Sequence, residues 1–238
     1  MKPLLLDLFC CEGGAARGYA KAGFRIEGVD LNRAVARRYP FTFHFGDALA
    51  FVREHGHRFD AIHASPPCQA YSSLAATLTP RQLANYPKLV EPVREALEAT
   101  GKPYIIENVV GAPLRDPVLL CGSMFGLSAP DVDGTPLRLE RHRLFESNVP
   151  LRQPPVHSHD PRVAVAGIYG GGASRRGTAN PANRGGYTPV LRVRQQLMGV
   201  RHMTQLGLSE AIPPAYTEYL GAQLLEHLNV ELPAANSA

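Results

Sequence analysis

A single cysteine lies where a nucleophile would be useful. Cys68 belongs to the segment Ser65-Pro66-Pro67-Cys68-Gln69, directly after an apolar run at residues 59–64. The two prolines fix the backbone before the thiol and remove two amide donors, so this loop can hold Cys68 in one place. A thiolate presented beyond a strand end can attack an electrophilic carbon. A lone cysteine is more often a small buried side chain, so the residues around Cys68 decide between these interpretations.

A glycine turn and two acids indicate a nucleotide-like ligand. An apolar run at residues 2–9 leads into Gly13 and Gly14, where the backbone can approach a ligand and the following helix offers free amides. Asp30 follows the next apolar run, at about the spacing at which a carboxylate binds ribose hydroxyls. Asp47 follows the third run and could accept a hydrogen bond from an adenine amino group.

Two other interpretations of this pattern stay open. NAD or FAD could satisfy it, although the spacing from Gly13 to Gly18 differs from the dinucleotide fingerprint and S-adenosylmethionine fits at least as well. The glycines could instead be plain turn residues and the acids could cap helices, as Asp30 would do for the helix that follows it.

Alternating apolar runs and helical segments would position these residues. We predict strands at 2–9, 25–29, 41–45, 59–64 and 104–107, and helices at 15–22, 32–39 and 82–100, the last interrupted near Pro87 and Pro92. This alternation is typical of a doubly wound, mostly parallel α/β sheet with helices on both faces. Ligands bind such sheets beyond the carboxyl ends of the strands, where Cys68 and both acids lie.

The second half is less regular. Residues 146–191 are rich in Pro, Gly, Arg and Asn, and we predict two short strands there, at 163–169 and 189–194. Helical spacing returns at 194–198 and 216–229, and the last residues are expected to fray.

The composition indicates one sizeable globular domain. The chain has 238 residues, of which 45% are hydrophobic, enough for a real core, and its formal net charge of +4 is compatible with a polyanionic partner. No apolar run approaches the roughly 20 residues of a membrane span, and the amino terminus turns acidic too soon for a signal peptide. We therefore expect a cytoplasmic protein.

The four cysteines and the histidines give no sign of a metal site. No Cys-x-x-Cys pair occurs, and the histidines lack zinc-ligand spacing, so we expect neither a disulfide framework nor a metal. Cys10 and Cys121 are expected to be buried, and His63 and His142 to be structural or to face phosphate.

Five motifs, in order, resemble those of the DNA cytosine carbon-5 methyltransferases. They are Asp7-Leu-Phe-Cys-Cys-Glu-Gly-Gly14 with Gly18, Ser65 to Gln69, Glu107-Asn108-Val109, Arg141-His142-Arg143-Leu-Phe145 and Ala211-Ile-Pro-Pro214. They cover roughly residues 4–145 and 195–228. The resemblance is to a compact, phage-like or stand-alone bacterial member. It implies the S-adenosylmethionine-dependent methyltransferase fold, with residues 1–145 catalytic and cofactor-binding, 146–194 a reduced target recognition region, and 195–238 a return to the catalytic domain.

The resemblance also implies a cofactor site. The cofactor would be S-adenosylmethionine, contacted by Phe9, Gly13, Gly14, Asp30, Leu31, Asp47, Ala48 and Pro66. Phe9 would lie against the adenine, Asp30 would hold the ribose and Asp47 would bind the adenine amino group.

By the same resemblance, Cys68 would add to carbon 6 of a cytosine flipped out of duplex DNA, which makes carbon 5 nucleophilic enough to take a methyl group. Glu107 would hydrogen-bond ring nitrogen 3 and the amino group and supply a proton. Arg141 or Arg143 would orient the base, and strand alternation would put both on one face. Loss of the carbon 5 proton would then expel the thiolate.

Nucleic-acid contacts are expected in two places. One is the Cys68 loop, at Gln69 and Ser72. The other is the short gap between the last two motifs, at Arg175, Arg176 and Arg184. Because this gap is short, we expect relaxed sequence recognition and salt-sensitive DNA binding; the alternative is a surface loop. We also expect a monomer.

The sequence departs from the family pattern at three places. Cys11 stands where glycine is usual, Leu139 where Gln often precedes the arginine pair, and Ser209-Glu210 where Gly-Asn is usual. Cys11 predicts a shifted turn or weaker cofactor binding. Several alternatives stay open. The substrate could be transfer RNA, the transferred group could be other than methyl, or the chain could be a non-catalytic DNA-binding relative. It could act with or without a restriction partner.

Overall fold

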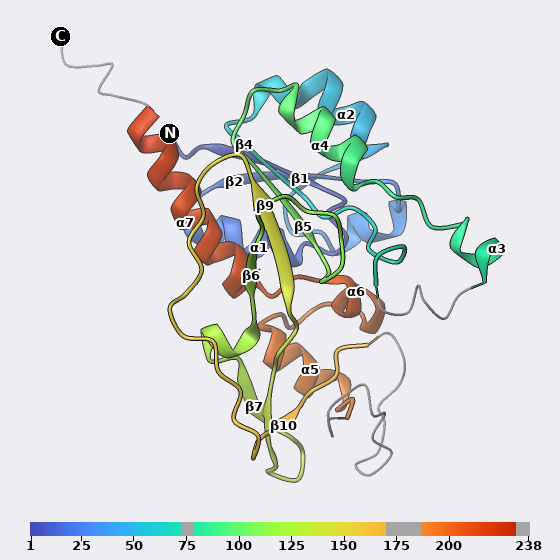
Figure 1. Cartoon of the computed structure of the whole chain (residues 1–238), viewed down its shortest axis with the longest axis vertical. Coiled ribbons are helices and arrows are strands. Elements are labelled where there is room, and N and C mark those ends of the chain that lie inside the picture. The colour runs from blue at the N-terminus through green and yellow to red at the C-terminus, as the bar shows by residue number, and fades with distance from the viewer. Residues whose placement is uncertain (73–78, 170–186, 232–238) are drawn as a thin grey trace.

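The fold is built on one large twisted sheet. The computed structural model describes residues 1–72, 79–169 and 187–231 (Figure 1). Seven strands form the sheet in the order β3-β2-β1-β4-β5-β9-β6. Their bounds are β1 Leu4–Leu8, β2 Arg25–Asp30, β3 Thr42–Phe45, β4 Ala61–Ala64, β5 Tyr104–Asn108, β6 Val118–Leu120 and β9 Arg143–Ser147. Neighbours from β3 to β5 pair in parallel, whereas β9 is antiparallel to both β5 and β6.

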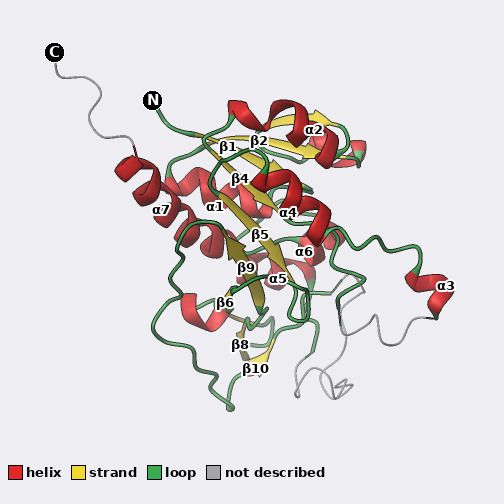
Figure 2. Cartoon of the chain, turned by 45° about the horizontal axis from the view of Figure 1, so that its top comes forward, coloured by secondary structure: helices red, strands yellow, loops and turns green. Residues whose placement is uncertain are grey.

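Helices cover both faces of this sheet (Figure 2). Helices α1 (Gly14–Ala22) and α7 (Pro214–Glu231) pack together on one face, and α2 (Ala48–His55) and α4 (Val90–Glu98) on the other. Strand alternation divides β1 between two cores, because Leu5 joins the cluster under α1 and α7 while Leu6 and Leu8 join the other. The predicted doubly wound, mostly parallel α/β sheet is therefore confirmed.

A smaller unit lies beyond the β6 edge. Strands β7 (Ser128–Pro130), β8 (Pro136–Arg138) and β10 (Ala164–Val165) form a second sheet, which shares a third core with α5 (Leu191–Met198) and α6 (Gln205–Glu210) (Figure 1). The remaining helices are short: the 3-10 segments η1 (Arg33–Arg37), η2 (Gly56–Arg58) and η4 (Gly122–Phe125), and α3 (Pro80–Leu83). Among the described residues, no helix has the length and apolar character to cross a membrane.

Several predicted elements differ from the structure. The strand expected at 189–194 is wrong, because α5 begins at Leu191 and its helical spacing buries Val193 and Leu197 on one side. The helix expected at 82–100 is two helices, and Pro92 does not break α4 because it occupies the first turn, where no amide donor is needed. The helix expected at 32–39 is the 3-10 segment η1, and the strand expected at 163–169 shrinks to β10 and one bridge from Ala166 to Tyr187. Helices α2 and α6 were not predicted.

Close contact between α1 and α7 requires Gly18. A Cβ added there would lie 2.0 Å from Thr217 Oγ1 and 2.1 Å from the Pro214 carbonyl oxygen. Thr217 cannot simply turn away, because its hydroxyl donates to the Ala15 carbonyl at 2.8 Å. We expect Gly18→Ala to lower the free energy of unfolding by about 3 kcal/mol, despite alanine's better helix propensity of about 1 kcal/mol.

Urea unfolding measures this loss. Gly46→Ala is the matched control, since nothing lies within 4 Å of its added Cβ, and its midpoint should stay close to that of the parent protein. Equal stability of the Gly18 and Gly46 variants would contradict the packing argument.

Candidate active site

The loop that carries Cys68 is anchored on both sides. The fully buried Asn108, which follows Glu107 at the end of β5, donates from Nδ2 to the Pro66 carbonyl at 3.0 Å. After the thiol, the amides of Tyr71 and Ser72 both donate to the Cys68 carbonyl at 3.0 Å. The loop therefore holds the half-buried thiol at the carboxyl end of β4, and Asn108 has a defined role as its anchor.

Glu107 and Arg143 form a shielded ion pair across β5 and β9. Arg143 Nε lies 3.0 Å from Glu107 Oε1, and Glu107 is only 6% exposed. Burial raises the pKa of the Glu107 carboxyl, and Arg143, Arg141 and a hydrogen bond from Ser65 partly oppose that rise. A buried carboxyl with a raised pKa takes up a proton more readily than an exposed one, which suits a group that passes a proton to a substrate.

The charge state of Glu107 influences Cys68. Burial raises the pKa of the Cys68 thiol most, the Glu107 carboxylate raises it further, and Arg143 and Arg141 lower it. Cys68 is therefore a thiol at rest. Because a neutral Glu107 removes the repulsion, protonation of the acid favours the thiolate.

A buried chain of hydrogen bonds connects Tyr19, His63 and Ser65 to Glu107. Tyr19 Oη lies 3.0 Å from His63 Nδ1, His63 Nε2 lies 2.8 Å from Ser65 Oγ, and Ser65 bonds to Glu107. His63 is fully buried, and burial lowers its pKa to about 3, so the ring is neutral. The structural interpretation of His63 is therefore the correct one, and phosphate contact is ruled out by its burial.

The two arginines of the Arg-x-Arg motif have different surroundings. The expectation that both lie on one strand face is wrong, because β9 begins at Arg143 and Arg141 precedes it with a φ of 34°. The Arg141 guanidinium donates to the carbonyls of Ser209 at 2.6 Å and Ala211 at 3.0 Å. Burial lowers the Arg141 pKa to about 9, which leaves the group charged at neutral pH. Arg141 thus holds the backbone of residues 209–211 next to the site, whereas Arg143 is the arginine that pairs with Glu107.

The turn after β1 has unusual backbone. Phe9 has a φ of 59° and Cys11 a φ of 46°, both in the left-handed region that disfavours side chains. The Cys11 amide donates to Asp30 Oδ2 at 2.9 Å, which ties the turn to the end of β2. Cys11 therefore holds a glycine-like conformation, and its Sγ lies 3.2 Å from Glu210 Oε2 on α6.

The two glycines of this turn are required by packing against protein. A Cβ on Gly13 would lie 2.8 Å from the Pro40 side chain, and one on Gly14 would lie 2.7 Å from the Ile212 carbonyl oxygen. Neighbouring segments therefore fill the space on the side-chain side of both glycines, and backbone contact with a ligand stays a prediction. The C-terminal return supplies one of those neighbours.

The predicted cofactor acids both hold backbone amides. Asp30 accepts from the Asn32 amide at 2.8 Å as well as from Cys11, while Asn32, not Asp30, caps η1. Asp47 is exposed and caps α2 by accepting from the Ala50 amide at 2.8 Å, so the capping interpretation holds for this acid. Each carboxylate has further lone pairs, so ligand contact stays a prediction for both.

The other predicted contact residues are spread around this edge. Leu31 is 63% exposed next to Asp30, Phe9 is half-buried, and the side chains of Ala48 and Pro66 are buried. In the Cys68 loop, Gln69 is exposed, and Ser72 Oγ donates to its carbonyl at 3.2 Å. Arg175, Arg176 and Arg184 lie outside the described residues.

Glu12 also belongs to the site, although the sequence alone did not indicate its role. Its buried carboxylate accepts from the Thr204 amide at 2.8 Å and the Thr204 hydroxyl at 2.6 Å, linking the glycine turn to the start of α6. No local pattern marks it, because its partner is 192 residues away in the chain.

Asp7 gives a testable dependence of stability on pH. It is buried under the turn and accepts from Tyr39 Oη at 3.1 Å, and burial raises its pKa to about 7. Between its unfolded pKa near 4 and pH 7 the folded chain keeps a proton that the unfolded chain releases, so this contribution to stability falls as pH rises, by up to about 4 kcal/mol. Asp7→Asn keeps an acceptor for Tyr39 and should remove that slope. Urea unfolding at several pH values checks it, and parallel stability curves for the two proteins would contradict it.

Two crystal structures share this fold along nearly their whole length. A candidate DNA modification methyltransferase encoded within an E. coli prophage is 15% identical with a TM-score of 0.60, and the match covers 95% of this chain and 99% of that one. The S. pombe Dnmt2 methyltransferase is 14% identical with a TM-score of 0.61, covering 96% and 100%. No protein-family model and no curated protein matches the sequence. At these identities the likeness establishes the fold alone, which this chain shares with these two methyltransferases.

Proposed function

We propose that this chain transfers a methyl group from S-adenosylmethionine to carbon 5 of cytosine in duplex DNA, through a covalent adduct with Cys68. The observation that carries the proposal is the electrostatic coupling between an anchored thiol and the buried Glu107–Arg143 ion pair. A nucleophile coupled to a buried acid is the arrangement that addition to a cytosine ring needs. The prophage methyltransferase that shares the fold supports DNA as the substrate.

The proposed reaction begins with proton transfer. Glu107 first takes up a proton, which favours loss of the Cys68 thiol proton to solvent; the thiolate then forms a bond to carbon 6 while Glu107 gives its proton to ring nitrogen 3. The electron pair displaced from the ring double bond makes carbon 5 nucleophilic, and carbon 5 would take the methyl group that S-adenosylmethionine supplies, the bond between that methyl group and the cofactor sulfur being broken. Loss of the carbon 5 proton to solvent then restores the double bond and expels the thiolate, and ring nitrogen 3 returns its proton to Glu107. Arg143 keeps Glu107 oriented and faces the developing charge. Because carbon 6 is stacked inside a duplex, the base must flip out to reach Cys68.

The residues at the ends of β1 and β2 suit the cofactor. Leu31 presents an exposed apolar side chain beside the Asp30 carboxylate, which matches a ligand that combines an adenine face with ribose hydroxyls. Bound there, S-adenosylmethionine would supply the methyl group. Phe9 and Leu31 would contact the adenine, Asp30 would accept from the ribose, and Asp47 would bind the adenine amino group.

Different parts of the sequence would have different roles in the proposed reaction. Residues 1–145 carry the candidate catalytic and cofactor residues, and 195–238 return to them, as the Arg141 and Glu12 contacts with residues 204–211 support. Residues 146–194 would read the target. Transfer RNA is the second substrate to test, since its cytosines could use the same chemistry.

Conversion sequencing of DNA from cells that express the protein tests the proposal. Expression of the parent protein should protect cytosines in a short sequence context, and expression of Cys68→Ala should not. If only cytosines in RNA are protected, the substrate is RNA and not DNA. Absence of both, with soluble folded protein in the cells, would contradict the proposed function.

A further inference from the structure

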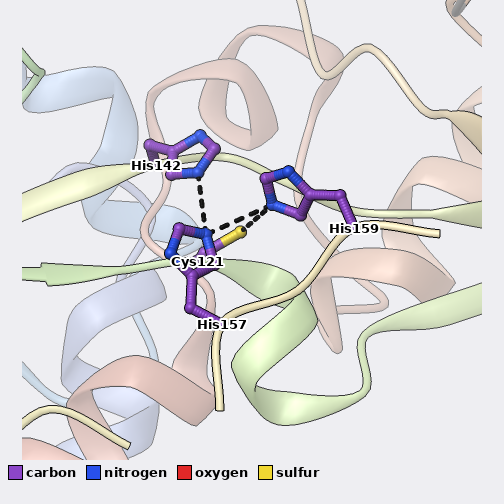
Figure 3. A group of neighbouring side chains, drawn as sticks. All are labelled: Cys121, His142, His157 and His159. Carbon is purple, nitrogen blue, oxygen red and sulfur yellow. Dashed lines mark hydrogen bonds between the residues drawn. The ribbon is translucent and has the colours of Figure 1, made fainter. Parts of the chain in front are cut away.

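A second cluster of reactive side chains lies outside the proposed site. Cys121 Sγ and one ring nitrogen each of His142, His157 and His159 all lie within 4.8 Å of one another (Figure 3). Cys121 follows β6 and His142 precedes β9, and the antiparallel register that pairs Leu120 with Arg143 brings these two together. The other two histidines come from the segment between β9 and β10, and Figure 3 shows His159 in contact with the sulfur and His157 in contact with the rings of His142 and His159.

The contacts within the cluster do not form an ordinary hydrogen-bond network. His157 Nε2 lies 3.2 Å from the Nε2 atoms of both His142 and His159, and His159 Nε2 lies 3.3 Å from Cys121 Sγ. Each ring nitrogen has a single in-plane lobe, which holds either a proton or a lone pair. One lobe cannot serve two neighbours well, whereas three ring nitrogens and a sulfur gathered within 4.8 Å of one another suit a cation.

The distances also suit a particular cation. A tetrahedral zinc ion with bonds of about 2.0–2.1 Å to nitrogen and 2.3 Å to sulfur separates its ligand atoms by roughly 3.3–3.6 Å. The three close contacts of 3.2–3.3 Å are near these tetrahedral edges. One thiolate with three imidazoles is a ligand set that zinc favours.

Residues behind the cluster orient its members. Glu140 Oε1 lies 3.6 Å from His159 Nδ1, and Arg138 holds that same carboxylate oxygen at 2.7 Å. A carboxylate at Nδ1 favours the proton there, which leaves the Nε2 lone pair for a metal. Ser123 Oγ lies 3.4 Å from Cys121 Sγ and can donate to a thiolate.

We propose that Cys121, His142, His157 and His159 bind one structural zinc ion. Binding would replace the thiol proton with a sulfur–zinc bond and release that proton to solvent. Four protein ligands close the coordination shell, so the ion would stabilise structure and take no substrate. The prediction of no metal from the sequence missed this arrangement because its ligands come from three separate segments, and only the β6–β9 register unites them.

The site would join an otherwise irregular segment to the sheet. The residues between β9 and β10 would be tied through His157 and His159 to the β6–β9 edge. His142 lies between Arg141 and Arg143, so zinc would also brace the backbone from which the paired arginine of the proposed active site projects. The zinc proposal does not depend on the methyltransferase proposal, because its test measures metal and not activity.

Elemental analysis of protein produced without a polyhistidine tag tests the site directly. We expect one zinc per chain, falling to less than about a tenth in Cys121→Ser and in His159→Gln. His202→Gln is the matched control, an exposed histidine away from the cluster, and it should keep its zinc. Zinc content that is the same in all four proteins would place the ion elsewhere and overturn the proposal.

Cobalt substitution keeps the test decisive if a variant fails to fold. Cobalt added to metal-stripped parent protein should give the intense visible bands of a tetrahedral ion and a thiolate charge-transfer band, and removing metal should lower the melting temperature. Parent protein that carries no zinc and gives only the weak bands of octahedral cobalt would overturn the proposal.

Discussion

Replacing Cys68 with serine is expected to reduce methyl transfer at least about 10⁴-fold, with the fold and cofactor binding retained. A serine hydroxyl is far less nucleophilic than a thiolate, and no described group beside it would serve as a strong base for the hydroxyl proton, since the Glu107 carboxylate is held by Arg143. Single-turnover transfer of labelled methyl groups to DNA measures the loss. Calorimetric titration with S-adenosylmethionine and the melting temperature report binding and folding.

Cys10→Ala is the matched control for this variant. Cys10 is a buried thiol whose side chain belongs to the core under α1, and burial raises its pKa far above the ordinary range, so it is unreactive. This control should lose about 1 kcal/mol of stability and keep its rate per folded molecule. A Cys68→Ser protein that transfers methyl groups at the parent rate would exclude Cys68 as the nucleophile.

Replacing Glu107 with glutamine is expected to reduce methyl transfer by about 10²–10⁴-fold, the usual contribution of a positioned acid. Glutamine keeps the shape of the side chain but cannot give a proton to ring nitrogen 3. It also removes the negative charge that raises the Cys68 pKa, so the thiol should become more reactive as catalysis is lost. Methyl-transfer rates and the pH dependence of Cys68 alkylation measure the two opposite effects together.

The opposite directions separate a catalytic role from simple damage to the fold. Glu98→Gln is the control, because Glu98 is exposed and paired on the surface with Arg115, where an ion pair contributes little. It should change neither rate. If Glu107→Gln slowed alkylation of Cys68 as well as methyl transfer, the proposed coupling between the two groups would be wrong.

The sequence predicted the parts of the fold that depend on local patterns. The apolar runs predicted the parallel strands. The motifs put Cys68 and Glu107 at the ends of two of these strands, and the structure makes the two strands neighbours, since β4 and β5 pair in parallel. The first half of helix α5 was mistaken for a strand because it resembles an alternating pattern, whereas helical spacing was predicted for residues 194–198. The difference between Arg141 and Arg143 also depends on tertiary contacts, since a left-handed residue and two distant carbonyls decide it.

Glycines and acids show the same limit. Gly13 and Gly14 were predicted to let the backbone approach a ligand, and the structure adds a packing reason for them, because Pro40 and Ile212 fill the space beside them. Asp47 fits a cofactor acid by its place in the sequence and a helix cap by its hydrogen bond. A residue type at a strand end thus predicts where a site lies more reliably than what each side chain contacts.

Covalent trapping on fluorinated DNA tests the central claim most directly. A duplex pool of random sequence containing 5-fluorocytosine is incubated with the protein and S-adenosylmethionine, then resolved under denaturing conditions. Fluorine at carbon 5 cannot leave as a proton does, so the Cys68 adduct should persist as a denaturant-stable complex whose cross-linked peptide contains Cys68. The complex should require the cofactor and be absent from Cys68→Ala. Methylation of ordinary DNA by the parent protein, with no trapped complex on the fluorinated pool, would contradict the covalent mechanism.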